Sequence, residues 1–379
     1  MMRIGMGATV LANGGRKQEL DGIGYYTQEL MRELLQLQCD VKPVVFGQTA
    51  LDPVMAQAVT HWGRYSTGSL LSAITGCAHT GSRRGAQHMD LFHATDHQIP
   101  KLRGIPVLAT LMDAIPLAHP EWANAHLRKV KNALWRKSAT WADHIVTISE
   151  YSKLEIVEHF GIVPDKISVV PLGVQERYFT RLPQEQTDEV LKTYQLNADF
   201  FLFIGTLQPR KNLQRIIQAH HALPETLRKA YPLVIIGREG WGSEALVKQL
   251  HLISGKDSIH WLGGVSDLHK RALLQRATAL VFPSLSEGFG LPVLESFASL
   301  TPVITSNNTS LPEVAADAAL MVNPLDVAAI AKAMGDLCQD MTLAQELRQR
   351  GLLRARHFTW RACAQKTYEI YKLMLSGKV

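Results

Sequence analysis

Short apolar runs alternate with longer stretches of helical periodicity along this chain, and the alternation occurs twice. The second half shows it more cleanly, from Phe200 to about Thr305. Buried strands that alternate with helices are typical of parallel sheets covered by helices on both faces. The pattern therefore predicts an α/β fold with two doubly wound parallel sheets. In the first half the expected strands are 3–7, 43–46, 91–93, 107–111, 145–148 and 167–170.

Two further segments have patterns of their own. Residues 174–198 are polar, and we interpret them as a linker between the two halves. Residues 360–375 carry apolar and aromatic side chains at near-helical spacing, which predicts a final amphipathic helix. With 379 residues, of which 46% are hydrophobic, the chain is too long for one ordinary core and suits two domains of roughly 180 residues each.

The composition favours a cytoplasmic protein without disulfides. No apolar stretch approaches the roughly 20 residues that span a bilayer, and the amino terminus leads directly into a strand rather than a signal peptide. The four cysteines, Cys39, Cys77, Cys338 and Cys363, lack Cys-x-x-Cys spacing. We therefore expect neither a disulfide framework nor a zinc site.

The most informative motif is the nonapeptide E-G-F-G-L-P-V-L-E, which runs from Glu287 to Glu295. The apolar run 279–284 precedes it as a buried strand, and Leu291-Pro292 places a proline near the first position of a helix. Ligands of open parallel sheets bind at the carboxyl ends of the strands. Glu287 is therefore expected at a pocket rim, with Glu295 facing the pocket from the helix.

The E-x7-E spacing resembles the signature of retaining glycosyltransferases with two Rossmann-like domains, the GT-B fold, and in particular glycosyltransferase family 4. A strand that ends at Gly205 before Arg210-Lys211 fits the same family. Further segments resemble the family and occur in the same order, namely 21–27, 90–93, 147–153, 233–237, 262–265 and 308–314. The first three of these, in the first half of the chain, are similar to bacterial mannosyl- and rhamnosyltransferases that assemble O-antigen and other surface polysaccharides.

The resemblance implies a division of the chain into an acceptor domain and a donor domain that face a cleft. Residues 1–180 would bind the acceptor, and residues 181–358 would bind a nucleotide diphosphate sugar. A carboxyl-terminal helix, about 359–379, would cross back to the first domain.

The chemistry of such a donor requires stabilisation of a departing diphosphate. The chain contains no Asp-x-Asp pair of the kind that metal-using transferases employ, but it has Arg210 and Lys211 where a strand ends and a helix begins near Asn212. Arginine, lysine and a helix amino terminus all favour phosphate oxygens. We expect no metal and no cofactor. The alternative is an Arg-Lys pair on ordinary solvated surface.

The two glutamates have competing interpretations. A carboxylate pair can mark a glycosidase, but both residues come from one loop and helix, which favours binding of hydroxyls from one side. The resemblance implies that Glu287 binds hydroxyls of the donor sugar and that Glu295 binds the ribose. The alternative is a solvated acid, or an acid that complements the helix dipole.

The resemblance also implies front-face transfer, in which the leaving phosphate accepts the proton of the acceptor, so no protein nucleophile is proposed. The expected catalytic residues are Arg210, Lys211, Glu287, Asp113 and His93. The expected donor-binding residues are Gly22, Gly24, Gly205, Thr206, Gly237, Gly264, Gly288, Phe289, Gly290, Leu291, Glu295, Thr309 and Ser310.

Three positions depart from the family pattern. Relatives often carry His-Asp where this chain has Met112-Asp113, so His93, or Asp96 or His97 in its loop, is a candidate replacement; the alternative is a polar residue that closes a strand. Leu300 stands where a glycine is usual, and Thr206 where some relatives have arginine.

The distribution of basic residues along the chain suggests where an acceptor could bind. Lys and Arg number 40 against 34 Asp and Glu, and residues 128–137 are basic and lie among apolar and aromatic residues. Such a helix could rest on anionic lipid and reach a lipid-linked glycan on the cytoplasmic face of the inner membrane; a solvated helix face is the alternative. No nucleic-acid module appears. The resemblance favours GDP-mannose or GDP-rhamnose as donor, with a UDP-sugar transferase or a non-catalytic nucleotide-sugar-binding partner as rivals.

Overall fold

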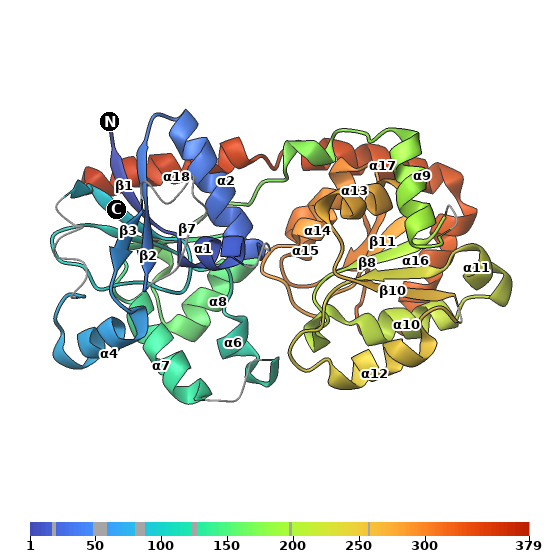
Figure 1. Cartoon of the computed structure of the whole chain (residues 1–379), viewed down its shortest axis with the longest axis horizontal. Helices are drawn as coiled ribbons and strands as arrows, with labels where there is room; N and C mark the ends of the chain where they lie inside the picture. Colours follow the sequence, from blue (N-terminus) through green and yellow to red (C-terminus); the bar gives the residue numbers. More distant parts are fainter. Residues whose placement is uncertain are drawn as a thin grey trace. The chain divides into compact units, whose positions relative to one another are not determined.

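The computed structural model describes residues 1–16, 20–47, 59–79, 88–122, 127–196, 199–256 and 258–378. It divides into two compact units (Figure 1). Unit 1 comprises Met1–Pro120, Ala125–Gly173 and Trp360–Val379, and unit 2 comprises Glu121–Asn124 and Val174–Thr359. The main passage from unit 1 to unit 2 is therefore at residue 174, several residues before the boundary placed at 180.

Unit 1 contains a parallel sheet of seven strands in the order β3-β2-β1-β4-β5-β6-β7. The order means that the chain runs outward from β1 to β3, returns to the other side of β1 at β4, and continues outward from there. This is the doubly wound arrangement, with its switch point between β1 and β4. The strands are β1 (Arg3–Gly7), β2 (Asp40–Phe46), β3 (Thr60–Trp62), β4 (Leu91–Ala94), β5 (Val107–Thr110), β6 (His144–Thr147) and β7 (Ile167–Val169).

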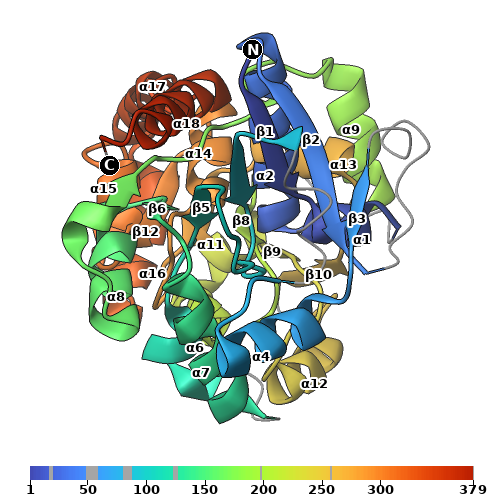
Figure 2. The same ribbon diagram turned by 90° about the vertical axis from the view of Figure 1, so that its left-hand side faces the viewer.

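Helices cover both faces of this sheet (Figures 1 and 2). Those on one face are α1 (Thr9–Arg16), α2 (Gly22–Gln36) and α18 (Trp360–Leu375), and those on the other are α4 (Tyr65–Thr75), α6 (Ile115–Ala118), α7 (Arg128–Ala139) and α8 (Glu150–Phe160). The expected final helix is confirmed at its predicted bounds. It returns to unit 1 and packs on α2, where the Trp360 and Tyr26 ring centroids lie 6.3 Å apart.

Capping residues that can be read in the sequence begin two of these helices. Asp21 Oδ1 accepts a hydrogen bond from the Gly24 amide over 2.8 Å at the start of α2. Ser149 Oγ accepts from the Ser152 amide over 3.0 Å at the start of α8. Each side chain satisfies an amide that has no partner within the helix.

Unit 2 repeats the topology with six parallel strands in the order β10-β9-β8-β11-β12-β13, so its switch point lies between β8 and β11. The strands are β8 (Phe201–Ile204), β9 (Leu233–Ile236), β10 (Ile259–Gly263), β11 (Ala279–Phe282), β12 (Val303–Ser306) and β13 (Leu320–Val322). Its helices are α9 (Gln184–Thr193), α10 (Leu213–His221), α11 (Glu225–Ala230), α12 (Glu244–Ile253), α13 (Asp267–Arg276), α14 (Leu291–Ala298), α15 (Leu311–Ala315), α16 (Val327–Gln339) and α17 (Met341–Ala355).

The expected linker over 174–198 has a different structure. Its helix α9 packs on α13 within unit 2 and buries Thr187, Val190 and Leu191. These buried positions lie among many charged ones, so the polar composition concealed a helix. The short strands β3 and β13 were also missed, because three residues are too few to establish an alternating pattern.

From composition we expected no membrane-spanning helix and no disulfide framework. Within the described part of the chain, no helix has the length and apolarity needed to cross a bilayer. All four cysteines are free thiols, with Cys39 and Cys363 buried and Cys77 exposed.

Candidate active site

Residues far apart in sequence meet at the switch point of unit 2. Strands β8 and β11 are parallel neighbours, so the loops that follow them leave the same edge of the sheet side by side. The loop after β8 forms a short 3-10 helix, Pro209–Lys211, and the loop after β11 leads to Glu287. The topology therefore brings Arg210 and Lys211 to Glu287.

These three residues form an ion-paired cluster. Lys211 Nζ lies 2.5 Å from Glu287 Oε1, and Arg210 Nη1 lies 3.1 Å from Glu287 Oε2. The exposed fraction is 10% for the Lys211 side chain and 8% for the Glu287 side chain. With two cations and one carboxylate, the cluster has one excess positive charge. Sequence analysis expected all three residues in the site, but not their mutual contact.

The electrostatics of Glu287 follow from this contact. Burial by itself would raise the pKa of the carboxyl group, but the charges of Lys211 and Arg210 outweigh burial and hold the pKa below its ordinary value. Lys211 Nζ also lies 4.8 Å from the centre of the Phe282 ring, where the ring face attracts a cation. The carboxylate is therefore ionised at neutral pH and fixes the position of both cations.

The backbone around the cluster is held by hydrogen bonds between the two loops. The Leu285 amide donates to the Arg210 carbonyl over 2.7 Å. Asn212, which has a left-handed φ of 61°, donates its side-chain amide to the carbonyls of Pro283 at 2.8 Å and Pro324 at 2.7 Å. Helix α10 begins at the next residue, so its positive amino-terminal end adjoins the cationic pair.

One of the predicted glycines is required by a close approach to backbone, and two others lie against side chains. A Cβ on Gly237 would lie 2.0 Å from the Gly205 carbonyl oxygen, and one on Gly264 would lie 2.2 Å from Arg238 Nε. Gly205 itself lies against the aliphatic stem of Lys211, at 3.7 Å from a Cβ position. Thr206, next in sequence, is exposed.

The E-x7-E loop is tied to the neighbouring segment through Ser310. The buried Ser310 hydroxyl lies within hydrogen-bonding distance of two carbonyls, those of Glu287 at 2.9 Å and Phe289 at 3.0 Å. The Phe289 ring packs on Phe358 with centroids 5.8 Å apart, so it points into the core. Gly288 is buried in this loop; Gly290 has a φ of +113° and precedes α14, which opens with Leu291.

Thr309 has an uncommon conformation beside this loop. It is a β-branched residue with a left-handed φ of 56°, a backbone state that costs free energy. Its hydroxyl oxygen is buried and makes no hydrogen bond within the described residues. Both features mark the segment next to Ser310 as a place where the fold holds strain.

Glu295 has a partner that sequence reasoning missed. Lys270 on α13 places its Nζ 2.9 Å from Glu295 Oε1 and 5.0 Å from the centre of the Tyr178 ring. Burial raises the pKa of Tyr178, and the nearby carboxylates of Glu295 and Asp267 raise it further. No spacing in the sequence links Lys270 to Glu295, because the contact depends on how α13 packs beside α14.

The predicted residues of unit 1 lie at the starts of helices or inside the sheet. Gly22 is exposed at the first position of α2, whereas the Gly24 amide is already bonded to Asp21. Asp113 follows β5, and its Oδ1 accepts from the Ile115 amide over 3.1 Å. This contact ties Asp113 to the first residue of α6, whose N-cap residue is Ala114.

His93 lies in the interior of unit 1. Its Nδ1 is 2.7 Å from the Tyr371 hydroxyl, and its Nε2 is 2.7 Å from the Thr110 hydroxyl. The side chain is fully buried, and burial lowers the pKa of His93 to about 3. Neither nitrogen is available to a ligand in this arrangement. We therefore propose that His93 is a neutral structural residue that joins the sheet to α18.

The other two candidates for the missing imidazole lie just beyond β4. Asp96 is buried, and its Oδ1 accepts from the Gln98 amide over 2.8 Å. Burial raises the pKa of Asp96, although its hydrogen bonds oppose the change. His97 is exposed, and its ring meets Trp135 edge-on at 4.6 Å. His97 is thus the more accessible of these two side chains.

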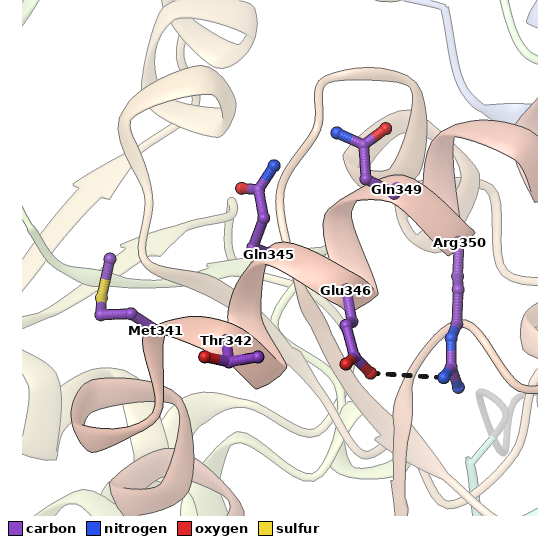
Figure 3. Close-up of a pocket in the computed structure, with 6 residues that line it drawn as sticks. All are labelled: Met341, Thr342, Gln345, Glu346, Gln349 and Arg350. Atoms are coloured by element: carbon purple, nitrogen blue, oxygen red, sulfur yellow. Dashed lines mark hydrogen bonds and ion pairs between the residues drawn. The ribbon is translucent and has the colours of Figure 1, made fainter.

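Neither a metal site nor the hollow on α17 coincides with this cluster within the described part of the chain. Among the described residues, no group of three or more His, Cys, Asp or Glu side chains is placed to hold a metal ion. A hollow of about 550 Å³ lies along α17 (Figure 3), but it contains none of the residues discussed above. Its lining is a set of polar or flexible side chains of one helix, namely Met341, Thr342, Gln345, Glu346, Gln349 and Arg350.

Comparison with known proteins gives matches in both units. Residues 20–177 match the family model "Glycosyltransferase Family 4", and residues 187–354 match "Glycosyl transferases group 1". The chain is 35% identical over 286 residues to O-antigen chain mannosyltransferase B of Escherichia coli, covering 75% of this chain and 74% of that protein. It is 30% identical to the serotype-specific mannosyltransferase WbdA of Escherichia coli over 62% of this chain, but only 29% of that longer protein.

A solved structure shows the same fold. The chain superimposes on a glycosyltransferase from Rickettsia africae ESF-5 with a TM-score of 0.71 at 18% sequence identity, covering 99% of this chain and 98% of the other. At this identity the likeness concerns the fold alone.

The cluster at the switch point gives a prediction about stability. Lys211→Met and Glu287→Gln should each destabilise unit 2 by about 3 kcal/mol, because each leaves a buried charge with too few partners. The double variant should lose much less than the sum, since the contact is removed from both sides. Unfolding free energies of the four proteins of this double-mutant cycle measure the coupling.

The exposed pair Lys332–Asp336 is the matched control, and its cycle should give a coupling near zero. Since the folded-state pKa of Glu287 is lowered from 4.5, the coupling at Glu287 should be present above that pH and fade as the pH falls through the folded-state pKa. Additive losses at neutral pH would contradict the cluster.

The burial of His93 as a neutral imidazole predicts that the free energy of unfolding depends on pH. Its pKa is about 3 when folded against 6.5 for the free side chain, so below 6.5 the unfolded chain binds a proton that the folded chain does not. Stability should therefore fall as the pH drops through this window, by up to about 1.4 kcal/mol per pH unit. His93→Gln should flatten unfolding free energy against pH there, whereas His357→Gln at an exposed position should not. An unchanged profile in His93→Gln would refute the buried neutral imidazole.

Proposed function

Because this chain belongs to glycosyltransferase family 4 and has its GT-B fold, we propose that it is a retaining, metal-independent transferase. It would move mannose or rhamnose from a GDP-sugar to a lipid-linked glycan in the assembly of O-antigen or a similar surface polysaccharide. The family and the fold confirm what the Glu287–Glu295 spacing indicated. The donor, the stereochemistry and the acceptor are the parts that are proposed.

The observation that carries the proposal is the cluster of Arg210, Lys211 and Glu287 at the switch point of unit 2. Its excess positive charge suits a diphosphate, and the cations are fixed before any ligand arrives. Preorganised charges stabilise a developing anion without the cost of reorientation. The arginine can use its planar fork and the lysine its compact charge on neighbouring oxygens of the leaving group.

The proposed reaction needs no nucleophile from the protein. The bond between the sugar's anomeric carbon and the diphosphate oxygen breaks, and the acceptor hydroxyl oxygen forms a bond to the same face of that carbon. The hydroxyl proton passes to the departing phosphate oxygen, so charge and atoms balance. Arg210 and Lys211 would hold the diphosphate as it gains negative charge.

Glu287 would have two tasks in this reaction. Its carboxylate holds both cations in the structure, and the two oxygens together can accept about four hydrogen bonds. It therefore retains capacity to accept from a hydroxyl of the donor sugar. Glu295, which is paired with Lys270, would accept from the ribose in the same way.

Guanine as the base is supported by a residue that the motifs did not single out. Arg238 follows β9, and its guanidinium lies against Gly264, which follows the neighbouring β10. An arginine fork matches the O6 and N7 acceptors of guanine, whereas uracil has no equivalent pair. The resemblance to mannosyltransferases of O-antigen chains supports mannose as the sugar and a glycan as the acceptor.

The direct test is thermal unfolding with GDP, UDP, ADP or dTDP in the presence of EDTA. A ligand that binds only the folded protein stabilises it by about 2.7 kcal/mol at a concentration a hundred times its dissociation constant. GDP should raise the midpoint of the wild type and raise that of Glu295→Ala less. A shift with UDP alone would replace the donor class, and no shift with any nucleotide would favour a non-catalytic partner.

The role of Arg238 predicts a selectivity among purines. Inosine diphosphate keeps O6 and N7 and should bind like GDP, whereas 7-deaza-GDP should bind about tenfold more weakly, because one hydrogen bond of the fork is lost. Arg238→Gln should remove the difference between GDP and 7-deaza-GDP. The exposed Arg361→Gln is the control and should keep it. Equal binding of the two nucleotides by the wild type would exclude this contact, whatever the outcome for GDP itself.

A further inference from the structure

Helix α4 is amphipathic in the reverse of the usual sense. Its buried residues are the small ones Gly68, Ser69 and Ser72. Its aliphatic residues point outward, with exposed fractions of 50% for Leu70, 47% for Leu71 and 75% for Ile74. A helix on the surface of a globular domain normally buries such side chains and exposes polar ones. The outward face of α4 therefore calls for a partner.

The orientation of α4 is fixed by close packing. A Cβ on Gly68 would lie 2.0 Å from His79 Nε2, so the helix backbone lies directly on the His79 ring. Phe46 packs edge-on against both His79 and Tyr65 at 5.4 and 5.3 Å. Rotating α4 to bury its leucines would break these contacts. The apolar face is thus built into the fold of unit 1.

Helix α4 is uncharged, and the helix that packs on it carries only positive charge. Residues 65–75 contain no charged side chain at all. Helix α7, which packs on α4 (Figures 1 and 2), carries basic residues at 128, 129, 131, 136 and 137 and no acidic one. It also exposes Val130, at 59%. Within the described part of the chain, Lys129 and Lys137 make no ion pair with a carboxylate.

An uncharged aliphatic face beside a purely basic helix matches the interface of an anionic membrane. Aliphatic side chains enter the boundary between headgroups and acyl chains, and lysines remain at the level of the lipid phosphates. A second protein with an apolar patch would cover the leucines and leave the excess of positive charge unexplained. Charge complementarity therefore selects the lipid surface.

We propose that the α4–α7 surface, made of Leu70, Leu71, Ile74, Val130, Lys129 and Lys137, docks unit 1 on an anionic membrane. The apolar residues supply the insertion, and the lysines supply the preference for anionic lipid, at about 1 kcal/mol each. The docking depends on the proposed function only for its purpose, which is to hold the enzyme where a lipid-linked acceptor lies. Binding to vesicles itself needs neither donor nor acceptor.

The test is co-sedimentation of the full chain with vesicles of phosphatidylcholine, with and without phosphatidylglycerol. The wild type should bind the vesicles that contain phosphatidylglycerol, and salt should weaken the binding. The triple variant Leu70→Ser/Leu71→Ser/Ile74→Ser should bind at least about tenfold more weakly. Lys129→Gln/Lys137→Gln should lose about fivefold per lysine on anionic vesicles and little on neutral ones.

Matched controls separate this surface from general hydrophobicity and general charge. Leu252→Ser/Leu325→Ser/Leu353→Ser removes three leucines of unit 2 that are exposed by 72%, 60% and 59%, and it should bind like the wild type. Lys248→Gln/Lys366→Gln removes two charges at exposed sites elsewhere and should also bind like the wild type.

The outcomes are distinct from those of the nucleotide test. Absence of vesicle binding by the wild type, or equal binding by wild type and α4 variant, would overturn the proposal. So would a dimer that the α4 variant loses, since a second copy would then cover this face. An unaltered thermal midpoint for each variant shows that it is folded. Vesicle binding without any nucleotide shift would count against the proposed function and leave the docking surface standing.

Discussion

The contact on which the candidate active site depends is the burial of Glu287 between Lys211 and Arg210. Three charges taken out of water are stable together only when their geometry is good and their remaining hydrogen bonds are met. The fold meets this condition by placing two strand ends side by side at the switch point of a doubly wound sheet. Ser310 and Asn212 then hold the two loops from behind through backbone carbonyls. A preorganised cluster with one excess positive charge is the consequence.

Unit 1 has the same topology but buries a neutral polar contact in place of ion pairs. Its sheet contains a buried imidazole, His93, whose two nitrogens are satisfied by hydroxyls from a neighbouring strand and from α18. A helix that belongs to the very end of the chain is thereby fixed to strands from its beginning. The polar contact specifies one position for α18, because a shift along its axis would leave a buried nitrogen without a partner. We therefore interpret His93, a candidate for chemistry from its sequence position, as a structural residue.

Departures from the family pattern also have physical explanations. Leu300, where the resemblance led us to expect glycine, has a left-handed φ of 60°. Glycine enters that region without steric cost, whereas leucine does so at about 1 kcal/mol. The turn between α14 and β12 therefore places a leucine in a conformation that favours glycine. The inverted helix α4 exposes aliphatic side chains to water, at a cost in free energy that contact with a lipid surface would recover.

The sequence alone determined the fold class, the strand and helix alternation, the final helix at 360–375 and the motif Glu287–Glu295, because each is written in local periodicity or in the spacing of a few residues. It also pointed to Arg210 and Lys211 as cations. Only the tertiary structure decided which groups meet: Glu287 with both cations, Glu295 with Lys270, and His93 with Tyr371. It also decided that 184–193 is a packed helix and that α4 turns its leucines outward. Such contacts join residues distant along the chain, and the packing of whole elements, which no local pattern records, brings them together.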